Sequence, residues 1–272
     1  MMNIMERLLA LILEFWNFYA LKENRKNLKI SAILLCGSML GIIFVIPYSL
    51  TLQRPYFEKM HLPIPLSILI LLQIVQNMFI FIFLILVGLF AAHKAGLGVP
   101  LLEAWVEKRQ SNLRKVLLIS VPLGIVAALL IIGLGYLFSP HMPAPVSGFE
   151  EPPAWQGFLA SFEGGISEEV MMRLFLMSLL VWMFSLLKKG SWAVWTSIFL
   201  ASLIFGALHL PTAFMIYNPT TILATAIVVL NGIAGLICGW LYWKHGLEAA
   251  MIAHFSADIV LHVIAPLIGG AG

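Results

Sequence analysis

The segment Ser167-Glu168-Glu169-Val170-Met171-Met172-Arg173 lies inside an apolar run that extends from about residue 155 to residue 187. A charged side chain at the centre of a membrane helix costs about 3 kcal/mol on insertion scales, so it persists only where it pairs, meets water or takes part in chemistry. On an α-helix, Glu169 and Arg173 lie one turn apart, with the acid before the base, which favours an ion pair. Glu168 points about 100° away from that pair. The segment therefore predicts that Glu169 and Arg173 form a structural ion pair and that Glu168 acts as an acid or base. The alternative is a buried ion pair with Glu168 as a polar residue of no function.

The composition of the whole chain indicates a membrane protein. Of its 272 residues, 61% are hydrophobic and only 11% are charged, and several apolar runs are long enough to cross a bilayer. Backbone groups in hydrocarbon must pair with one another, so the spanning structure is either a helix bundle or a closed barrel. Barrel strands alternate apolar and polar residues, and these runs do not. We predict an all-α, polytopic transmembrane helix bundle with the lipid bilayer as its partner; the net charge of +3 requires no nucleic acid.

We expect about seven spans and three regions along the chain. Residues 1–29 form an amphipathic N-terminal segment whose helix, at about residues 1–21, lies in the membrane interface. Residues 30–150 form N-terminal transmembrane helices, and residues 151–272 form the core. The expected spans cover residues 30–50, 66–92, 116–138, 155–187, 191–209, 220–243 and 247–268. The expected connections include a loop over residues 51–65, a short amphipathic helix over residues 101–108 and a loop after Pro211.

Basic residues predict how the bundle is oriented. The segments 22–29, 93–115, 188–190 and 244–246 hold four, five, two and one Lys or Arg residues. The segments on the other side hold two, both of them within residues 51–65. Because cytoplasmic loops carry the excess of Lys and Arg, we expect a multi-pass protein of the cell membrane with a cytoplasmic N-terminus. Cys36 and Cys238 lie far apart in apolar runs, and we expect no disulfide.

Two further groups of polar residues lie in the apolar spans. His209 ends the fifth span, four residues after Phe205, and His254 and Asp258 lie one turn apart in the last span. A lone histidine at the end of a span is more common as an interfacial residue than as a ligand. Asp258, however, is the only aspartate in the chain, and a histidine–aspartate face inside a span favours a functional site.

Together these patterns compose one candidate site, formed by Glu168, Glu169, Arg173, His209, His254 and Asp258. Acids and histidines in a dry bundle suit hydrolysis, in which a glutamate removes a proton from water and returns it to the leaving group. A second group then stabilises the developing oxyanion. Two histidines and a carboxylate can also hold zinc, but the His-Glu-x-x-His pattern is absent and we expect no cofactor. A proton-coupled transporter is disfavoured because the chain shows no internal repeat.

The three motifs, in this order, resemble the CPBP family of intramembrane proteases, described both as metalloproteases and as glutamic proteases. This family comprises the type II CAAX-processing prenyl proteases and their bacterial relatives in bacteriocin processing and immunity. The resemblance is carried by Glu168, Glu169 and Arg173, by Phe205 and His209, and by His254 and Asp258, and it covers about residues 155–268. It implies a catalytic core over residues 151–272. It also implies an endopeptidase that cleaves near the C-terminus of a membrane protein or lipidated peptide, including prenylated CAAX-type proteins. The alternatives are a non-catalytic adaptor or immunity protein and a zinc-dependent intramembrane protease.

The resemblance also implies roles for the site residues. Glu168 and His209 would activate water, His254 and residue 258 would form the oxyanion site, and Glu169 with Arg173 would be mainly structural. The prenyl-protease branch has asparagine where this chain has Asp258. Asparagine donates a hydrogen bond to an oxyanion and an ionised aspartate repels one, so Asp258 would act in its protonated form or orient His254.

The spacing of these residues is incompatible with straight, parallel spans. At about 1.5 Å per residue, Glu168 lies about 28 Å from the Lys189 end of its span, whereas His254 lies about 12 Å from the same surface. His209 lies near the opposite end of its own span. A shared site therefore requires that the fourth span be long or tilted, or that the span ends differ from those expected.

Overall fold

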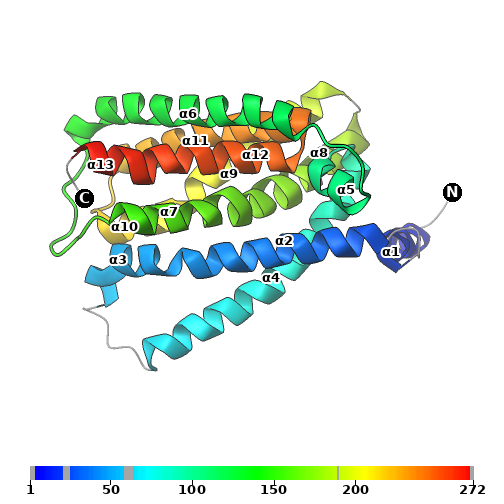
Figure 1. The fold of residues 1–272 in the computed structure, drawn as a ribbon, viewed down its shortest axis with the longest axis horizontal. Helices are drawn as coiled ribbons and strands as arrows, with labels where there is room; N and C mark the ends of the chain where they lie inside the picture. Colours follow the sequence, from blue (N-terminus) through cyan, green and yellow to red (C-terminus); the bar gives the residue numbers. More distant parts are fainter. Residues whose placement is uncertain (1–3, 21–24, 58–63, 189, 270–272) are drawn as a thin grey trace.

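The computed structural model describes residues 4–20, 25–57, 64–188 and 190–269, and within these ranges the chain forms helices and no strand. Seven helical segments of the described chain are long and apolar enough to cross a membrane, and they run alongside one another (Figure 1). These segments are Arg25–Phe44, Leu66–Ala95, Leu113–His141, Ala154–Leu187, Ser191–Ile216, Thr221–His245 and Leu247–Gly269. The prediction of an all-α polytopic bundle is confirmed. Three lysines used to predict the orientation lie outside the described residues: Lys22, Lys59 and Lys189.

Within the described ranges, the bundle contains thirteen α-helices, together with a 3₁₀-helix and π-helical segments that are labelled η. The first half contains α1 (Ile4–Ala20), α2 (Arg25–Phe44), α3 (Ile46–Phe57), α4 (Leu66–Ala95), α5 (Pro100–Val106), α6 (Leu113–Phe138) and η2 (Ser139–His141). The second half contains α7 (Ala154–Phe162), η3 (Glu163–Glu168), η4 (Val170–Met177), α8 (Ser178–Leu187), α9 (Ser191–Leu208), α10 (Leu210–Ile216), α11 (Thr221–His245), α12 (Leu247–Asp258), η5 (Ile259–Ile264) and α13 (Ala265–Gly269). Pro145 and Tyr217 form an isolated antiparallel β-bridge.

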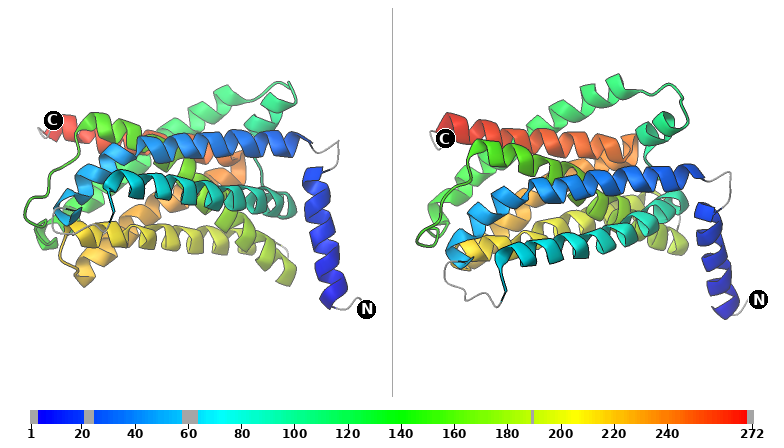
Figure 2. Two further views of the ribbon diagram at one scale, coloured as in Figure 1. Left: turned by 90° about the horizontal axis from the view of Figure 1, so that it is seen from below. Right: turned by 60° about the horizontal axis from the view of Figure 1, so that its bottom comes forward.

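The first helix, α1, runs across the ends of the spans instead of along them (Figure 2). Its inner face packs on α4, where the Tyr19 hydroxyl donates a hydrogen bond of 2.6 Å to the Leu86 carbonyl and Phe15 contacts the Phe90 ring. Its outer face exposes large apolar side chains: Met5, Leu9, Ile12, Leu13 and Trp16. An apolar face turned away from the protein is the arrangement expected of a helix that lies at the membrane surface, so the predicted N-terminal amphipathic helix is present.

Two predicted loops are helical instead. Residues 51–57 belong to α3, and the residues after Pro211 form α10. Each of these helices has a proline in its first turn, Pro47 in α3 and Pro211 in α10, where the missing N–H of proline has no partner to lose. The first span also begins at Arg25 and ends at Phe44, five to six residues earlier than expected at both ends.

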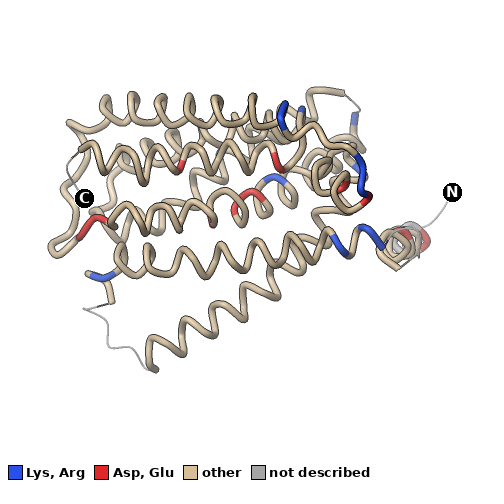
Figure 3. The backbone as a smooth tube through the Cα atoms, in the orientation of Figure 1, with Lys and Arg blue, Asp and Glu red and all other residues tan. Residues whose placement is uncertain are grey.

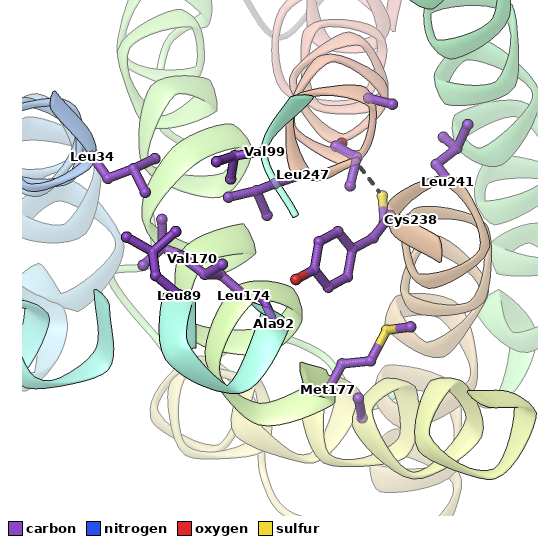
Figure 4. Packing of buried hydrophobic residues seen from close by; sticks show 14 of the residues in the cluster. Leu34, Leu89, Ala92, Val99, Val170, Leu174, Met177, Cys238, Leu241 and Leu247 are labelled. Atoms are coloured by element: carbon purple, nitrogen blue, oxygen red, sulfur yellow. Dashed lines mark hydrogen bonds between the residues drawn. The ribbon is translucent and has the colours of Figure 1, made fainter. Parts of the chain in front are cut away.

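The centre of the bundle is a continuous apolar core in which α2, α4, η4, α11 and α12 meet. Figure 4 shows Leu34, Leu174 and Leu247 converging from three of these helices, and Leu247 and Leu174 are fully buried. Small residues allow close contact: a Cβ on Gly124 of α6 would collide with the backbone of Ala253. This contact holds α12, which carries His254, against α6.

Candidate active site

The segment that the sequence analysis singled out is not a regular α-helix. Residues of η3 and η4 form π-helical turns between α7 and α8, and such turns are frequent at functional sites. The turns carry Gly164, whose position leaves no room for a side chain: a Cβ there would collide with the Asp258 carboxylate and lie 3.2 Å from Nε2 of His254. The fourth span is therefore shaped to let two polar side chains of α12 approach its backbone.

The predicted ion pair between Glu169 and Arg173 is present. Oε1 of Glu169 lies 2.9 Å from Nη1 of Arg173, and the two side chains are 0% and 2% exposed. The guanidinium also donates to the Gly235 carbonyl of α11 at 3.3 Å and lies 4.9 Å from the centre of the Phe205 ring on α9. Burial without a partner would be costly for either charge, so this pair connects three spans at the base of the site.

Glu169 also holds His254 in place. Nδ1 of His254 lies 2.7 Å from Oε1 of Glu169, so this nitrogen carries the proton of the hydrogen bond. Nε2, on the other side of the ring, lies 3.6 Å from Oε2 of Glu168 and 3.7 Å from Oδ1 of Asp258. The structural pair thus aims one reactive ring nitrogen at the second glutamate.

His209 reaches the same carboxylate from a different span. It lies at the junction of α9 and α10, where Nδ1 donates to the Phe205 carbonyl at 2.8 Å. Since a carbonyl oxygen can only accept, Nε2 is left free to accept a proton, and it lies 3.9 Å from Oε1 of Glu168. The Phe205 ring makes an edge contact with each imidazole, with centroid distances of 4.8 Å to His209 and 5.6 Å to His254.

The six predicted site residues therefore lie together, although their spacing along straight spans argued against it. The fourth span is 34 residues long, from Ala154 to Leu187. Its last helix, α8, continues past the start of α12 (Figure 1). Glu168 can therefore lie beside His254 although it is farther from the end of its own span. Exposure differs across the site: the His209 and Glu168 side chains are 34% and 20% exposed, whereas that of His254 is 6% exposed. The site is thus open on the side of Glu168 and His209.

Sequence reasoning missed two carboxylates. Glu163 lies close enough to Glu168 for the two carboxyl groups to interact. On an α-helix, residues five apart diverge, but the i to i+5 pattern of the π-helical turns in η3 aligns them. Glu248 is buried at the start of α12, where Oε1 accepts the Leu102 backbone N–H at 2.8 Å and so caps α5. A count of every acid within the apolar runs would have found both.

A cavity of about 450 Å³ lies beside the site, between α2 and α3 on one side and α4 on the other. Its inner end is formed by Glu163 and Met171, and its apolar walls carry four uncharged polar side chains: Ser49, Gln53, Gln73 and Asn77. The first half of the chain therefore contributes the walls of a passage that leads to the fourth span.

One group of side chains has the spacing of a metal site. Within the described residues, ligand atoms of Glu169, Cys238 and His254 lie within 4.8 Å of one another. Oε1 of Glu169 is already shared by the Arg173 guanidinium and by Nδ1 of His254. A cation placed there would face the positive charge of Arg173 and compete with that hydrogen bond, so the donor set does not fit a metal.

An acid faced by two oriented histidines and enclosed by membrane spans has the groups that an intramembrane hydrolase requires. Comparison with known families gives the same class: residues 150–260 match the model of the Rce1-like family, described as type II CAAX prenyl endopeptidase. This region is therefore a domain of that protease family, as its motifs predicted, and the chain is a multi-pass membrane protein. No curated protein and no solved structure matches the chain.

Proposed function

We propose that the protein is an intramembrane endopeptidase that hydrolyses a peptide bond near the C-terminus of a membrane-associated protein, with Glu168 as the general base. One observation carries this proposal. The Glu168 carboxylate faces Nε2 of both histidines at 3.6 and 3.9 Å and forms a direct hydrogen bond with neither. Gaps of this size between polar groups suit a water molecule held among the three. Structural ion pairs are closer, as the 2.9 Å contact of Glu169 with Arg173 illustrates.

The reaction follows from the placement of these groups. Glu168, assisted by His209, takes a proton from water while the water oxygen forms a bond to the carbonyl carbon of the substrate. The carbonyl electrons move to oxygen, and His254 and the protonated form of Asp258 stabilise the resulting oxyanion. The carbon–nitrogen bond then breaks, and the proton held by Glu168 passes to the departing amine. Glu169 and Arg173 do not react; they fix the ring of His254.

The cavity beside Glu163 suits the approach of the substrate. Its apolar walls accept aliphatic groups, and the side-chain amides of Gln53, Gln73 and Asn77 offer donors and acceptors to an extended backbone. A lipidated, prenylated C-terminal peptide is the substrate class that this combination favours. The concentration of Lys and Arg at one end of the bundle further supports a cell-membrane protein with a cytoplasmic N-terminus.

The test is cleavage of a prenylated C-terminal reporter peptide by the purified full chain in detergent. The wild type is expected to release the C-terminal fragment, and Glu168→Gln is expected to do so about 10²- to 10⁴-fold more slowly. Its melting temperature is expected to match the wild type, because glutamine can keep the hydrogen bond with Glu163 and because the ion-pair partners of Glu168 lie no closer than 3.6 Å. Glu151→Gln is the matched control, an exposed carboxylate just before the fourth span that should retain the activity.

Equal rates for the wild type and Glu168→Gln would remove Glu168 from the mechanism. A biological phenotype that survives in a Glu168→Ala/His209→Ala double variant would favour the non-catalytic adaptor instead.

We also propose that the reaction requires no metal, because Arg173 occupies the position at which a cation would bind Glu169. Activity is expected to persist after treatment with EDTA and phenanthroline. Full loss of activity with either chelator, restored by added zinc, would overturn this part of the proposal.

A further inference from the structure

A second cavity, of about 750 Å³, lies outside the candidate active site, between α2 and α5. It is at the end of the bundle where most Lys and Arg residues gather, which we call the basic end (Figure 3). The buried Ala104 forms the floor of the cavity, and the more exposed Ala32 and Ile33 of α2 form an apolar wall. The exposed Lys29, Lys108 and Arg109 form its rim. We call this cavity the basic groove. An apolar floor under a cationic rim suits a molecule with an anionic head and a hydrocarbon tail.

The charges around the basic groove are unbalanced. Lys26 donates to Glu107 at 2.7 Å, and Arg109 lies 2.6 Å from the same carboxylate. Hydrogen bonds from Lys26 and then Arg109 lower the pKa of the Glu107 carboxyl, so this acid stays ionised and engaged at neutral pH. Within the described residues, Lys29 and Lys108 form no ion pair. The groove therefore retains positive charge that complements an anion.

Lys108 occupies a backbone position that favours glycine. Its φ is +55°, the one positive value among the described non-glycine residues. The turn closes α5 with a backbone bond from Arg109 N–H to the Ala104 carbonyl at 2.8 Å and one from Lys108 N–H to the Trp105 carbonyl at 3.2 Å. This is the helix-ending motif in which the left-handed residue is usually glycine. A lysine is energetically disfavoured at this backbone position compared with glycine. Replacing Lys108 by glycine therefore removes the side chain without straining the turn, which allows its role to be tested.

The basic groove lies at the end of the spans, which is the level at which lipid headgroups are expected. The α1 helix crosses the same end of the bundle with Leu9, Ile12 and Trp16 exposed (Figure 2). Trp105, which borders the groove, is 68% exposed. Tryptophan is enriched where hydrocarbon meets water, and basic residues just beyond a span attract anionic lipids. A lipid of that leaflet can therefore reach the groove without leaving the membrane.

We propose that the basic groove binds the phosphate headgroup of an anionic phospholipid, with Lys29, Lys108 and Arg109 around the phosphate and an acyl chain along Ala32 and Ile33. Phosphate is the shared chemistry of a lipid headgroup and a free anion. The apolar floor and the position of α1 favour the lipid. This site is independent of the proposed peptidase activity.

The experiment measures the melting temperature of the purified full chain in a neutral detergent as phosphatidylglycerol is added, with phosphatidylcholine as the zwitterionic reference. Phosphatidylglycerol is expected to raise the melting temperature in a saturable manner, and phosphatidylcholine is not. Inorganic phosphate and a soluble acidic peptide form two further arms. Neither is expected to stabilise the protein at concentrations at which the lipid saturates.

Variants then locate the effect. Lys108→Gly removes one charge and suits the left-handed backbone, so it is expected to melt at or above the wild-type temperature without lipid. Its apparent affinity for phosphatidylglycerol is expected to fall about fivefold, the effect of one basic residue near an anionic surface. Lys29→Gln is expected to fall similarly. Lys115→Gln, which removes an exposed lysine of the basic end outside the groove, is the matched control and should respond as the wild type does.

The proposal fails if phosphatidylcholine protects as well as phosphatidylglycerol, or if Lys108→Gly and Lys29→Gln both retain wild-type affinity. A full shift with inorganic phosphate alone would assign a free anion instead of a lipid. A full shift with the acidic peptide would assign a protein partner.

Discussion

Two ionic clusters of the protein have similar ion-pair distances in different surroundings. In the interior, Glu169 lies 2.9 Å from Arg173 and 2.7 Å from His254. At the basic end, Glu107 lies 2.7 Å from Lys26 and 2.6 Å from Arg109. The interior side chains are at most 6% exposed, whereas those of the basic end are at least 31% exposed. The distances are alike, so burial decides what each cluster contributes.

The difference separates positioning from binding. In a low-dielectric interior, removing one partner leaves an uncompensated charge, so the Glu169 cluster holds its members fixed. At the surface, water replaces a lost partner at little cost, so the Glu107 cluster can exchange partners. The first kind of cluster suits a site that must hold His254 in one orientation. The second suits a groove that admits and releases a charged headgroup.

The largest expected effect tests the interior cluster. Arg173→Met leaves Glu169 buried without its cation and is expected to lower the free energy of unfolding by about 3–5 kcal/mol. Denaturant unfolding in detergent measures this loss. The Glu169→Gln/Arg173→Met double variant, which removes both charges, should recover part of it. An Arg173→Met variant as stable as the wild type would mean that the pair contributes no more to the free energy of unfolding than a surface ion pair does.

A somewhat smaller effect is expected at Asp258, which lies 3.7 Å from His254. Asp258→Ala removes a group near the oxyanion and should reduce the rate of peptide cleavage about 10²- to 10³-fold. Asp258→Asn restores a hydrogen-bond donor and should retain most of the wild-type rate. If the asparagine variant is as slow as the alanine variant, the carboxylate itself is required, and orientation of His254 becomes its role.

A third prediction concerns the contact between η3 and α12. Gly164→Ala places a methyl group against the Asp258 carboxylate and beside His254, so it should cost about 1–3 kcal/mol through overpacking and should slow cleavage as well. Gly133→Ala on α6 is the matched control, since a Cβ there meets nothing within 4 Å. Equal behaviour of the two variants would show that the approach of α12 to the fourth span is not tight.

The smallest expected effect tests the surface cluster. Glu107→Gln should leave the unfolding free energy unchanged within error, because exposed ion pairs contribute little. Since Lys26 and Arg109 lower the pKa of Glu107, any contribution is present at neutral pH and is lost only in acid, as the pH falls through the folded-state pKa. Thermal unfolding at pH 7 and at acidic pH measures both. A large loss at pH 7 would remove the contrast between the two clusters.

The sequence by itself determined the features that depend on local geometry. Apolar runs predicted the fold class and the seven spans, because a backbone in hydrocarbon must pair within its own helix. The spacing of Glu169 and Arg173 predicted their ion pair, because residues four apart share a helix face. The motif order predicted the protease family of residues 150–260.

Only the tertiary structure decided what lies between spans. No spacing along the chain places His254 on Glu169, or His209 opposite Glu168, because those contacts depend on how far each span extends and where it changes direction. The π-helical turns that align Glu163 with Glu168 depend likewise on packing against α12, at a glycine whose missing side chain leaves room for Asp258. Contacts within one helix turn are fixed by backbone geometry, whereas contacts between helices are fixed by the side chains that pack between them.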